Sequence, residues 1–190
     1  MSRVTTAFVA ALAMFLPIGR PLLVGLTPAI GIGAGLLTTR AAFAQSAQDW
    51  FDSGVAKFER GDFQGAIADF TKAIEIYPYA LAYYNRGLAK DNLKDYRGAI
   101  ADYTKAIEYK PNYAYAYSNR GNIKSELNDY LGAINDYTKA IEIDPDDAEY
   151  YINRGIALER VDGLSSACRD WKKAVDLGDT RPIEWVRNQC

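Results

Sequence analysis

Aspartate and arginine recur at near-constant intervals in this chain, and their pairing is the first chemistry that the sequence suggests. A row of arginines could bind an anionic ligand, but guanidinium and carboxylate groups also form bidentate ion pairs where helices pack. The aspartate is present in all four units, but the arginine only in the last three. We therefore expect each of the first three aspartates to pair with the arginine of the following unit. The predicted pairs are Asp69–Arg86, Asp102–Arg120 and Asp136–Arg154, with Arg187 as a partner for Asp170.

The chain contains no histidine. This excludes Ser–His–Asp and Cys–His catalysis and every zinc site that needs a histidine ligand. Two cysteines are too few for a four-cysteine metal site. The carboxylates recur at regular positions, which is typical of a solvated face. We therefore expect no catalytic residue, no cofactor and no metal, and an enzyme is the least favoured functional alternative.

Residues 1–44 contain three arginines and no acidic residue, with apolar runs at 7–18 and 22–37. They end in Ala42-Phe43-Ala44, a small–x–small pattern typical of signal-peptide cleavage. We predict a signal peptide over residues 1–44, cleavage near Ala44 and export to a periplasm, a lumen or the extracellular space. The alternative is a retained membrane anchor, although 22–37 is slightly short for a full span.

Cys168 and Cys190 are the only cysteines, and an exported chain enters an oxidising compartment. We predict a disulfide between them, which would tie the C-terminus to a segment 22 residues earlier. Two free, partly buried thiols are the alternative.

A motif of glycine, alanine and an aromatic residue recurs every 33 or 34 residues, beginning near Gly54, Gly87, Gly121 and Gly155. Within one unit the apolar residues at 99, 100, 103, 106 and 107 follow helical spacing. An aspartate suited to N-capping precedes this stripe in three units, and a proline closes three units. These residues are Asp62, Asp95 and Asp129, and Pro78, Pro111 and Pro145. Self-similarity at this period predicts helix pairs that stack on their neighbours.

The spacing aromatic–x3–Gly–x11–Ala–x3–aromatic–x2–Ala–x4–Pro resembles the tetratricopeptide repeat (TPR). The resemblance implies an all-α, right-handed superhelical solenoid with a concave groove that binds peptides or partner helices. We expect four repeats over 47–179, at 47–79, 80–113, 114–147 and 148–179. The fourth lacks the closing proline, and we expect 180–190 to form a capping helix with Trp185 as its buried anchor.

The family places its ligand-binding residues at recurring positions of the first helix in each repeat. Carried over by position, the predicted groove set is Phe51, Val55, Phe58, Leu81, Tyr84, Leu88, Asp91, Tyr115, Asn122, Glu126, Ile152, Ile156 and Glu159. The basic carboxylate clamp of chaperone-binding relatives is missing, because Phe51, Val55 and Tyr115 occupy its positions.

These residues predict a non-catalytic adaptor or assembly scaffold. The groove set is apolar and aromatic in its N-terminal half and acidic in its far half, which favours a ligand with an apolar anchor and a basic flank. The net charge of −2 gives little support to nucleic-acid binding. A membrane-tethered scaffold is the alternative if residues 1–44 are retained, and weak self-association could occur through the exposed first repeat.

Overall fold

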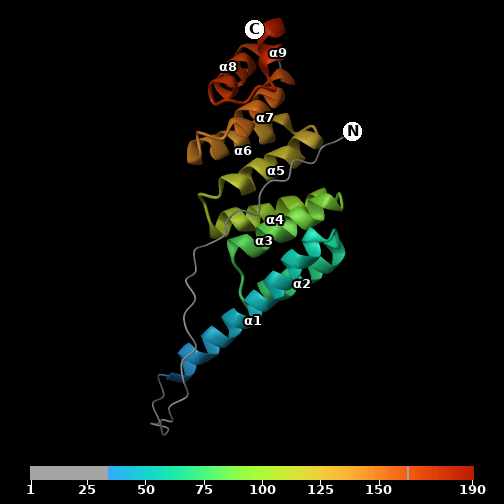
Figure 1. The fold of residues 1–190 in the computed structure, drawn as a ribbon, viewed down its shortest axis with the longest axis vertical. Helices are drawn as coiled ribbons and strands as arrows, with labels where there is room; N and C mark the ends of the chain where they lie inside the picture. Colours follow the sequence, from blue (N-terminus) through green and yellow to red (C-terminus); the bar gives the residue numbers. More distant parts are fainter. Residues whose placement is uncertain (1–33, 162) are drawn as a thin grey trace.

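The structure is a computed structural model that describes residues 34–161 and 163–190, with side chains from residue 46 onward. These residues form helices and turns without a strand (Figure 1). The helices are α1 (Ala34–Glu59), α2 (Phe63–Ile76), α3 (Ala80–Asn92), α4 (Tyr96–Tyr109), α5 (Ala114–Glu126), α6 (Tyr130–Ile143), α7 (Ala148–Glu159), α8 (Leu164–Asp176) and α9 (Ile183–Gln189). The predicted all-α fold class is confirmed.

Consecutive helices pack as four pairs, α1 with α2, α3 with α4, α5 with α6, and α7 with α8. The pairs follow one another along the long axis of the molecule, from α1 at one end to α9 at the other (Figure 1). We call the first helix of each pair (α1, α3, α5, α7) an A-helix and the second (α2, α4, α6, α8) a B-helix. Each pair contacts mainly its neighbours, as expected of a solenoid.

The turn between the two helices of a pair follows from two local features. The predicted N-cap side chains of Asp62, Asp95 and Asp129 accept hydrogen bonds from the backbone N–H three residues later, at 2.9–3.0 Å. In the first three pairs the residue before this cap has a left-handed backbone. It is Gly61 at φ 80°, Lys94 at φ 64° and Asn128 at φ 64°. Only glycine adopts this conformation without steric cost, so Lys94 is held there by the turn around it.

The helices of a pair meet where a B-helix ring lies against an A-helix glycine. A Cβ atom added to Gly54 would lie 2.6 Å from the ring of Phe70, and at Gly87 it would lie 2.7 Å from Tyr103. Gly121 meets Tyr137 in the same way, at 2.9 Å, and Gly155 meets Trp171. Fully buried alanines at 66, 99, 133 and 167 lie one turn before these rings. The recurring small residues therefore allow close approach, and the rings fill the space around them.

Helix α1 differs from the other A-helices in length. It has 26 residues against 13 in α3, and its N-terminal part extends beyond α2 (Figure 1). The predicted cleavage position after Ala44 falls inside this helix. The rest of the predicted signal segment, residues 1–33, lies outside the described residues, and so the domain boundaries stay a prediction.

The C-terminal helix α9 covers the end of the last pair by packing on α8. The rings of Trp185 and Trp171 lie 5.3 Å apart between centroids. Trp171 is buried, but Trp185 is only half-buried, so the expectation of a buried anchor was wrong. Trp185 lies at the edge of the cluster of Tyr151, Ile152 and Ala174, where it is only partly buried.

Replacing Ala133 by Leu should lower the free energy of unfolding by about 1–3 kcal/mol, because its site on α6 is fully buried and has no room for three more carbons. Ala101→Leu is the matched control, since Ala101 is exposed on α4, and should change stability by less than about 0.5 kcal/mol. Chemical denaturation of both variants measures the difference. Equal stability of the two would contradict this packing.

Candidate functional site

The recurring arginines form bidentate ion pairs, but not with the predicted partners. Arg86 donates from Nε and Nη2 to the two carboxylate oxygens of Asp102, at 2.8 and 2.7 Å. Arg120 pairs in the same way with Asp136, and Arg154 with Asp170. The predicted pairs Asp69–Arg86, Asp102–Arg120 and Asp136–Arg154 were therefore wrong. Each arginine binds the aspartate of its own repeat, 16 residues later.

Asp69 lacks an arginine partner, because Ser53 stands where the other repeats have arginine. It keeps the lysine, since Lys57 corresponds to Lys90 and Lys124, which contact Asp102 and Asp136 at 2.7 and 2.8 Å. Ser53 donates to the Asp69 carboxylate at 2.6 Å, and Lys57 pairs with it at 2.6 Å. Burial alone would raise the pKa of Asp69, but the hydrogen bonds from Lys57 and Ser53 lower it below its usual value. The predicted Arg187–Asp170 pair was also wrong, since Arg187 pairs with Glu184 at 3.0 Å.

The arginines also connect neighbouring repeats, through a third donor. Nη1 of Arg86 donates to the hydroxyl of Thr71 at 3.1 Å, and Thr71 lies on the preceding B-helix. Thr104 accepts from Arg120 and Thr138 from Arg154, at 3.0 and 3.2 Å. We call this set of arginines, aspartates and threonines the Arg–Asp ladder. Because each guanidinium already has a carboxylate and a hydroxyl partner, the ladder supports the stack and not an anion-binding site.

The predicted groove set divides into exposed, half-buried and buried residues. Tyr115 is 53% exposed and Leu81 is 40% exposed. Phe51 and Ile152 are buried, and the ring of Phe51 packs on those of Phe70 and Tyr79. The exposed carboxylates are Glu126 and Glu159, and the half-buried members are Val55, Phe58, Tyr84, Leu88, Asp91, Asn122 and Ile156. The buried members contribute to packing, so only the exposed and half-buried members could contact a ligand directly.

Tyr84 is the centre of an aromatic cluster within this set. Its ring centroid lies 4.8 Å from that of Tyr113 and 5.8 Å from that of Tyr103. Its hydroxyl oxygen accepts a hydrogen bond from Asn119 Nδ2 at 2.9 Å, which connects α3 to α5. Burial raises the pKa of Tyr84 to about 12. This hydroxyl is therefore a neutral hydrogen-bonding group throughout the physiological pH range.

Asn122 makes the corresponding connection in the next repeat. Its Oδ1 accepts from the hydroxyl of Tyr137 at 2.8 Å and from Asn153 Nδ2 at 3.3 Å. The hydroxyls of Tyr103 and Tyr150 and the indole N–H of Trp171 are buried without a hydrogen-bond partner among the described residues. Tyr113, Tyr103 and Tyr137 were not in the predicted set, because Tyr113 precedes its A-helix and the other two lie on B-helices.

Two carboxylates of the set, Asp91 and Glu126, come from the ends of α3 and α5. Burial raises the pKa of Asp91, the charge of Glu126 raises it further, and Lys94 lowers it. Neither carboxylate forms a salt bridge within residues 34–161 and 163–190. The acidic part of the groove set thus includes Asp91 of the second repeat.

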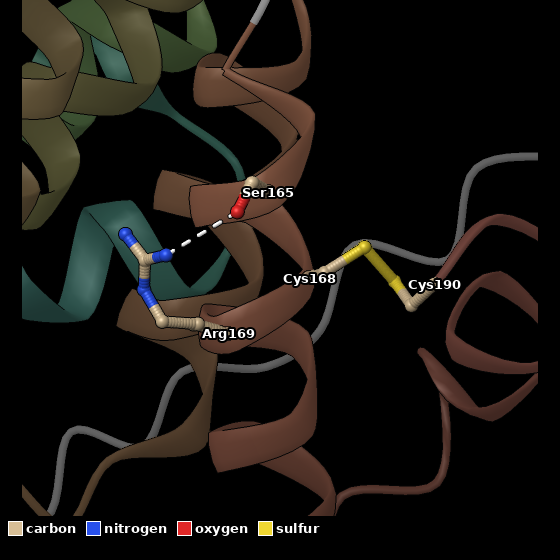
Figure 2. Close-up of a disulfide and its surroundings, with 4 residues drawn as sticks. All are labelled: Ser165, Cys168, Arg169 and Cys190. Atoms are coloured by element: carbon tan, nitrogen blue, oxygen red, sulfur yellow. Dashed lines mark hydrogen bonds between the residues drawn. A yellow bond between two sulfur atoms is a disulfide. The ribbon is translucent and has the colours of Figure 1, made fainter.

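Cys168 and Cys190 are joined in the structure, and the bond connects α8 to the residue that follows α9 (Figure 2). Their Cα atoms lie 5.6 Å apart. Arg169, the neighbour of Cys168, donates to the hydroxyls of Ser165 and Ser166 at 3.4 and 2.8 Å. An open cavity of about 420 Å³ lies beside the bond, and another of about 260 Å³ lies between α6 and α8 near Arg154.

The described ranges hold no group of three histidine, cysteine or acidic side chains that could bind a metal ion. Within 34–161 and 163–190, no helix combines the length and the apolar composition that a membrane crossing requires.

Three family models match successive parts of the chain. Two models described as tetratricopeptide repeat match residues 50–79 and 80–113, and one described as TPR repeat matches 121–162. The chain belongs to the tetratricopeptide repeat family. None of the curated proteins matches its sequence.

Solved structures of other TPR proteins share this fold. MamA is 24% identical with a TM-score of 0.68, over 79% of this chain and 96% of MamA. YrrB, described as a TPR protein with an unusual peptide-binding site, is 17% identical with a TM-score of 0.67, over 83% and 89%. The first TPR of Spaghetti (RPAP3), bound to the HSP90 peptide SRMEEVD, is 27% identical with a TM-score of 0.61, over 63% and 95%. The likeness to MamA and YrrB shows the TPR fold of this chain.

Replacing Arg120 by Ala should lower the free energy of unfolding by about 1–3 kcal/mol, because it leaves the buried carboxylate of Asp136 with Lys124 as its remaining cation. Lys139→Ala is the matched control, since Lys139 and its partner Glu142 are about half exposed, and should cost less than about 1 kcal/mol. Urea unfolding measures both. A loss for Arg120→Ala no larger than for the control would contradict a structural role for the ladder.

Proposed function

We propose that this TPR protein is a non-catalytic adaptor or assembly scaffold that binds a peptide or partner helix along its A-helices. The observation that carries the proposal is the exposure of Leu81 and Tyr115, two large apolar side chains at equivalent first-turn positions of α3 and α5. A ligand that runs across adjacent repeats would cover large apolar and aromatic side chains exposed at matching positions of those repeats.

The proposed ligand has an apolar anchor and a basic flank. Leu81, Leu88 and Tyr115 would receive the anchor, and the carboxylates of Asp91, Glu126 and Glu159 would attract the flank. The structural relatives support a peptide ligand, since RPAP3 was solved with one and YrrB is described by its peptide-binding site. The RPAP3 peptide is acidic, whereas the groove set of this chain has no lysine or arginine. The two proteins should therefore prefer ligands of opposite charge.

Tyr115→Ala should reduce recovery of the partner at least several-fold when the tagged protein captures it from its own cells, because it removes the most exposed aromatic ring of the groove set. Tyr109→Ala is a matched control, since Tyr109 is 50% exposed but lies on B-helix α4 and stacks on Tyr83. Quantitative mass spectrometry compares the same partner across the three baits. Equal recovery with both variants would contradict a ligand site on the A-helices.

We also propose that the protein is exported and that the Cys168–Cys190 bond forms in the oxidising compartment it enters. The small–x–small pattern at residues 42–44 supports export, and the placement of the two cysteines supports the bond. A disulfide that closes a loop of this length stabilises a fold by about 3 kcal/mol in the chain-entropy model. Here the bond would keep α9 packed on α8. Helix α9 needs this support because it has only seven residues and few contacts of its own.

The intact mass of the protein isolated from its own cells tests both parts of this proposal. We expect a chain that begins at Gln45 and is lighter by two hydrogen atoms than its reduced form. A mass that includes residues 1–44 would contradict cleavage and favour a membrane-tethered scaffold. Two thiols that react with an alkylating reagent without prior reduction would contradict the disulfide.

A further inference from the structure

Helix α9 takes the place that the A-helix of a following repeat would have. The A-helices α3, α5 and α7 begin at 80, 114 and 148, and α9 begins at Ile183, 35 residues after the start of α7. Trp185 stands 34 residues after Tyr151, the aromatic residue at the same position of α7, and packs against the apolar cluster that contains it. Like an A-helix, α9 packs on the B-helix before it. It therefore covers the surface of α8 on which a further repeat would stack.

The residues that join the earlier repeats are replaced at the junction of α8 and α9. A B-helix threonine at 71, 104 or 138 accepts a hydrogen bond from the arginine of the next repeat. The corresponding residues here are Lys172 and Asn188, and a lysine side chain has no acceptor with which to continue the Arg–Asp ladder. Cys168 stands where the earlier B-helices have isoleucine, at 67, 100 and 134. The Cys168–Cys190 bond thus links α8 to α9 where the ladder links the earlier repeats.

This bond is accessible from the side of Cys190. Cys190 is exposed, whereas Cys168 on α8 is only 8% exposed. The open cavity of about 420 Å³ beside the bond is lined by both cysteines and by Lys172. A small thiol can therefore reach the sulfur atom of Cys190 more easily than that of Cys168.

Lys172 is the cation best placed to act on the bond. It lies four residues after Cys168 on α8, so the two side chains are neighbours on one face of the helix. It is exposed and forms no salt bridge within residues 34–161 and 163–190. Arg169 also lines the cavity, but its side chain points toward Ser165 and donates to it (Figure 2). A neighbouring ammonium group stabilises a cysteine thiolate and so makes it a better leaving group.

We infer that the Cys168–Cys190 bond is a thiol–disulfide exchange site for a small thiol, at which Lys172 stabilises the departing thiolate of Cys168. The thiolate of the small thiol attacks Sγ of Cys190, the bond between the two cysteines breaks, and its electron pair leaves on Sγ of Cys168. The product carries a mixed disulfide on Cys190 and a thiolate on Cys168. A second molecule of the small thiol then displaces Cys190 from the mixed disulfide. Two small thiols are thereby oxidised to one disulfide, and their two electrons and two protons end on the two cysteines.

Exchange at this bond would free α9 from the end of the stack. Helix α9 has seven residues, and its ring contact with α8 is the one between Trp185 and Trp171, 5.3 Å apart between centroids. Once the bond is open, the half-buried Trp185 and a few neighbours must hold α9, so we expect the helix to leave α8. The end of the solenoid is then uncovered. This inference rests on the disulfide of the proposed function and adds the reaction that opens it.

The test measures the rate at which 2-mercaptoethanol opens the bond in the oxidised protein without air. Lys172→Gln should slow the exchange about threefold to fivefold, which is the size of one exposed charge interaction. Lys173→Gln is the matched control, because Lys173 is the next residue of α8, is also exposed and does not line the cavity. It should leave the rate nearly unchanged. Equal rates in the two variants would overturn the role of Lys172.

The position of the first mixed disulfide tests the direction of attack. After a short reaction and rapid alkylation, peptide mass spectrometry should find the mixed disulfide on Cys190 and the alkyl group on Cys168. A mixed disulfide mainly on Cys168 would overturn the mechanism.

Tryptophan fluorescence tests the release of α9, because exchange should separate Trp185 from Trp171. The same change should appear in Cys190→Ser without any added thiol. A signal that stays unchanged in both experiments would contradict the release of α9.

The outcome is separable from that of the proposed function. A protein isolated from its own cells with two free thiols contradicts the proposed disulfide and the exchange site with it. A protein that carries the bond but exchanges equally fast in both lysine variants keeps the proposed disulfide and loses only the exchange site. The ligand path along the A-helices is tested separately by Tyr115→Ala.

Discussion

The close approach of a B-helix ring to an A-helix glycine is the contact on which the rest of the structure depends. At Gly54, Gly87 and Gly121 even a Cβ atom would lie within 3 Å of the ring. This contact sets the distance between the helices of each pair and buries the alanines one turn before the rings. Because it recurs in every pair, the two helices of each unit approach in the same way, which lets similar units stack in one direction.

Polar groups also hold neighbouring repeats together. In the Arg–Asp ladder each guanidinium binds the aspartate of its own repeat and the threonine of the preceding repeat. The same side chain therefore connects the two helices of one repeat to each other and to the repeat before. Asn119 and Asn122 connect neighbouring repeats on the groove set. Leu81 and Tyr115 are not needed for either set of contacts, which leaves them free for a ligand.

Much of the fold could be predicted from the sequence, because the period, the small residues and the capping aspartates each have a local physical meaning. The partners of the arginines could not be found by counting residues. Ser53 stands where the other repeats have arginine, and Lys57, like Lys90 and Lys124, gives the aspartate of its own repeat a cation. The recurrence of Lys57, Lys90 and Lys124 was the available signal. The hydrogen bond from Asn119 to Tyr84 had no such signal, because it depends on how two repeats pack.

Hydrogen exchange of the protein with and without its captured partner tests most directly whether the ligand binds along the A-helices, because it reports which helices the ligand covers. We predict slower exchange at the backbone amides of α3 and α5, with little change in the exposed turns of α4, α6 and α8. Protection confined to the B-helices or to α9, with α3 and α5 unchanged, would contradict it.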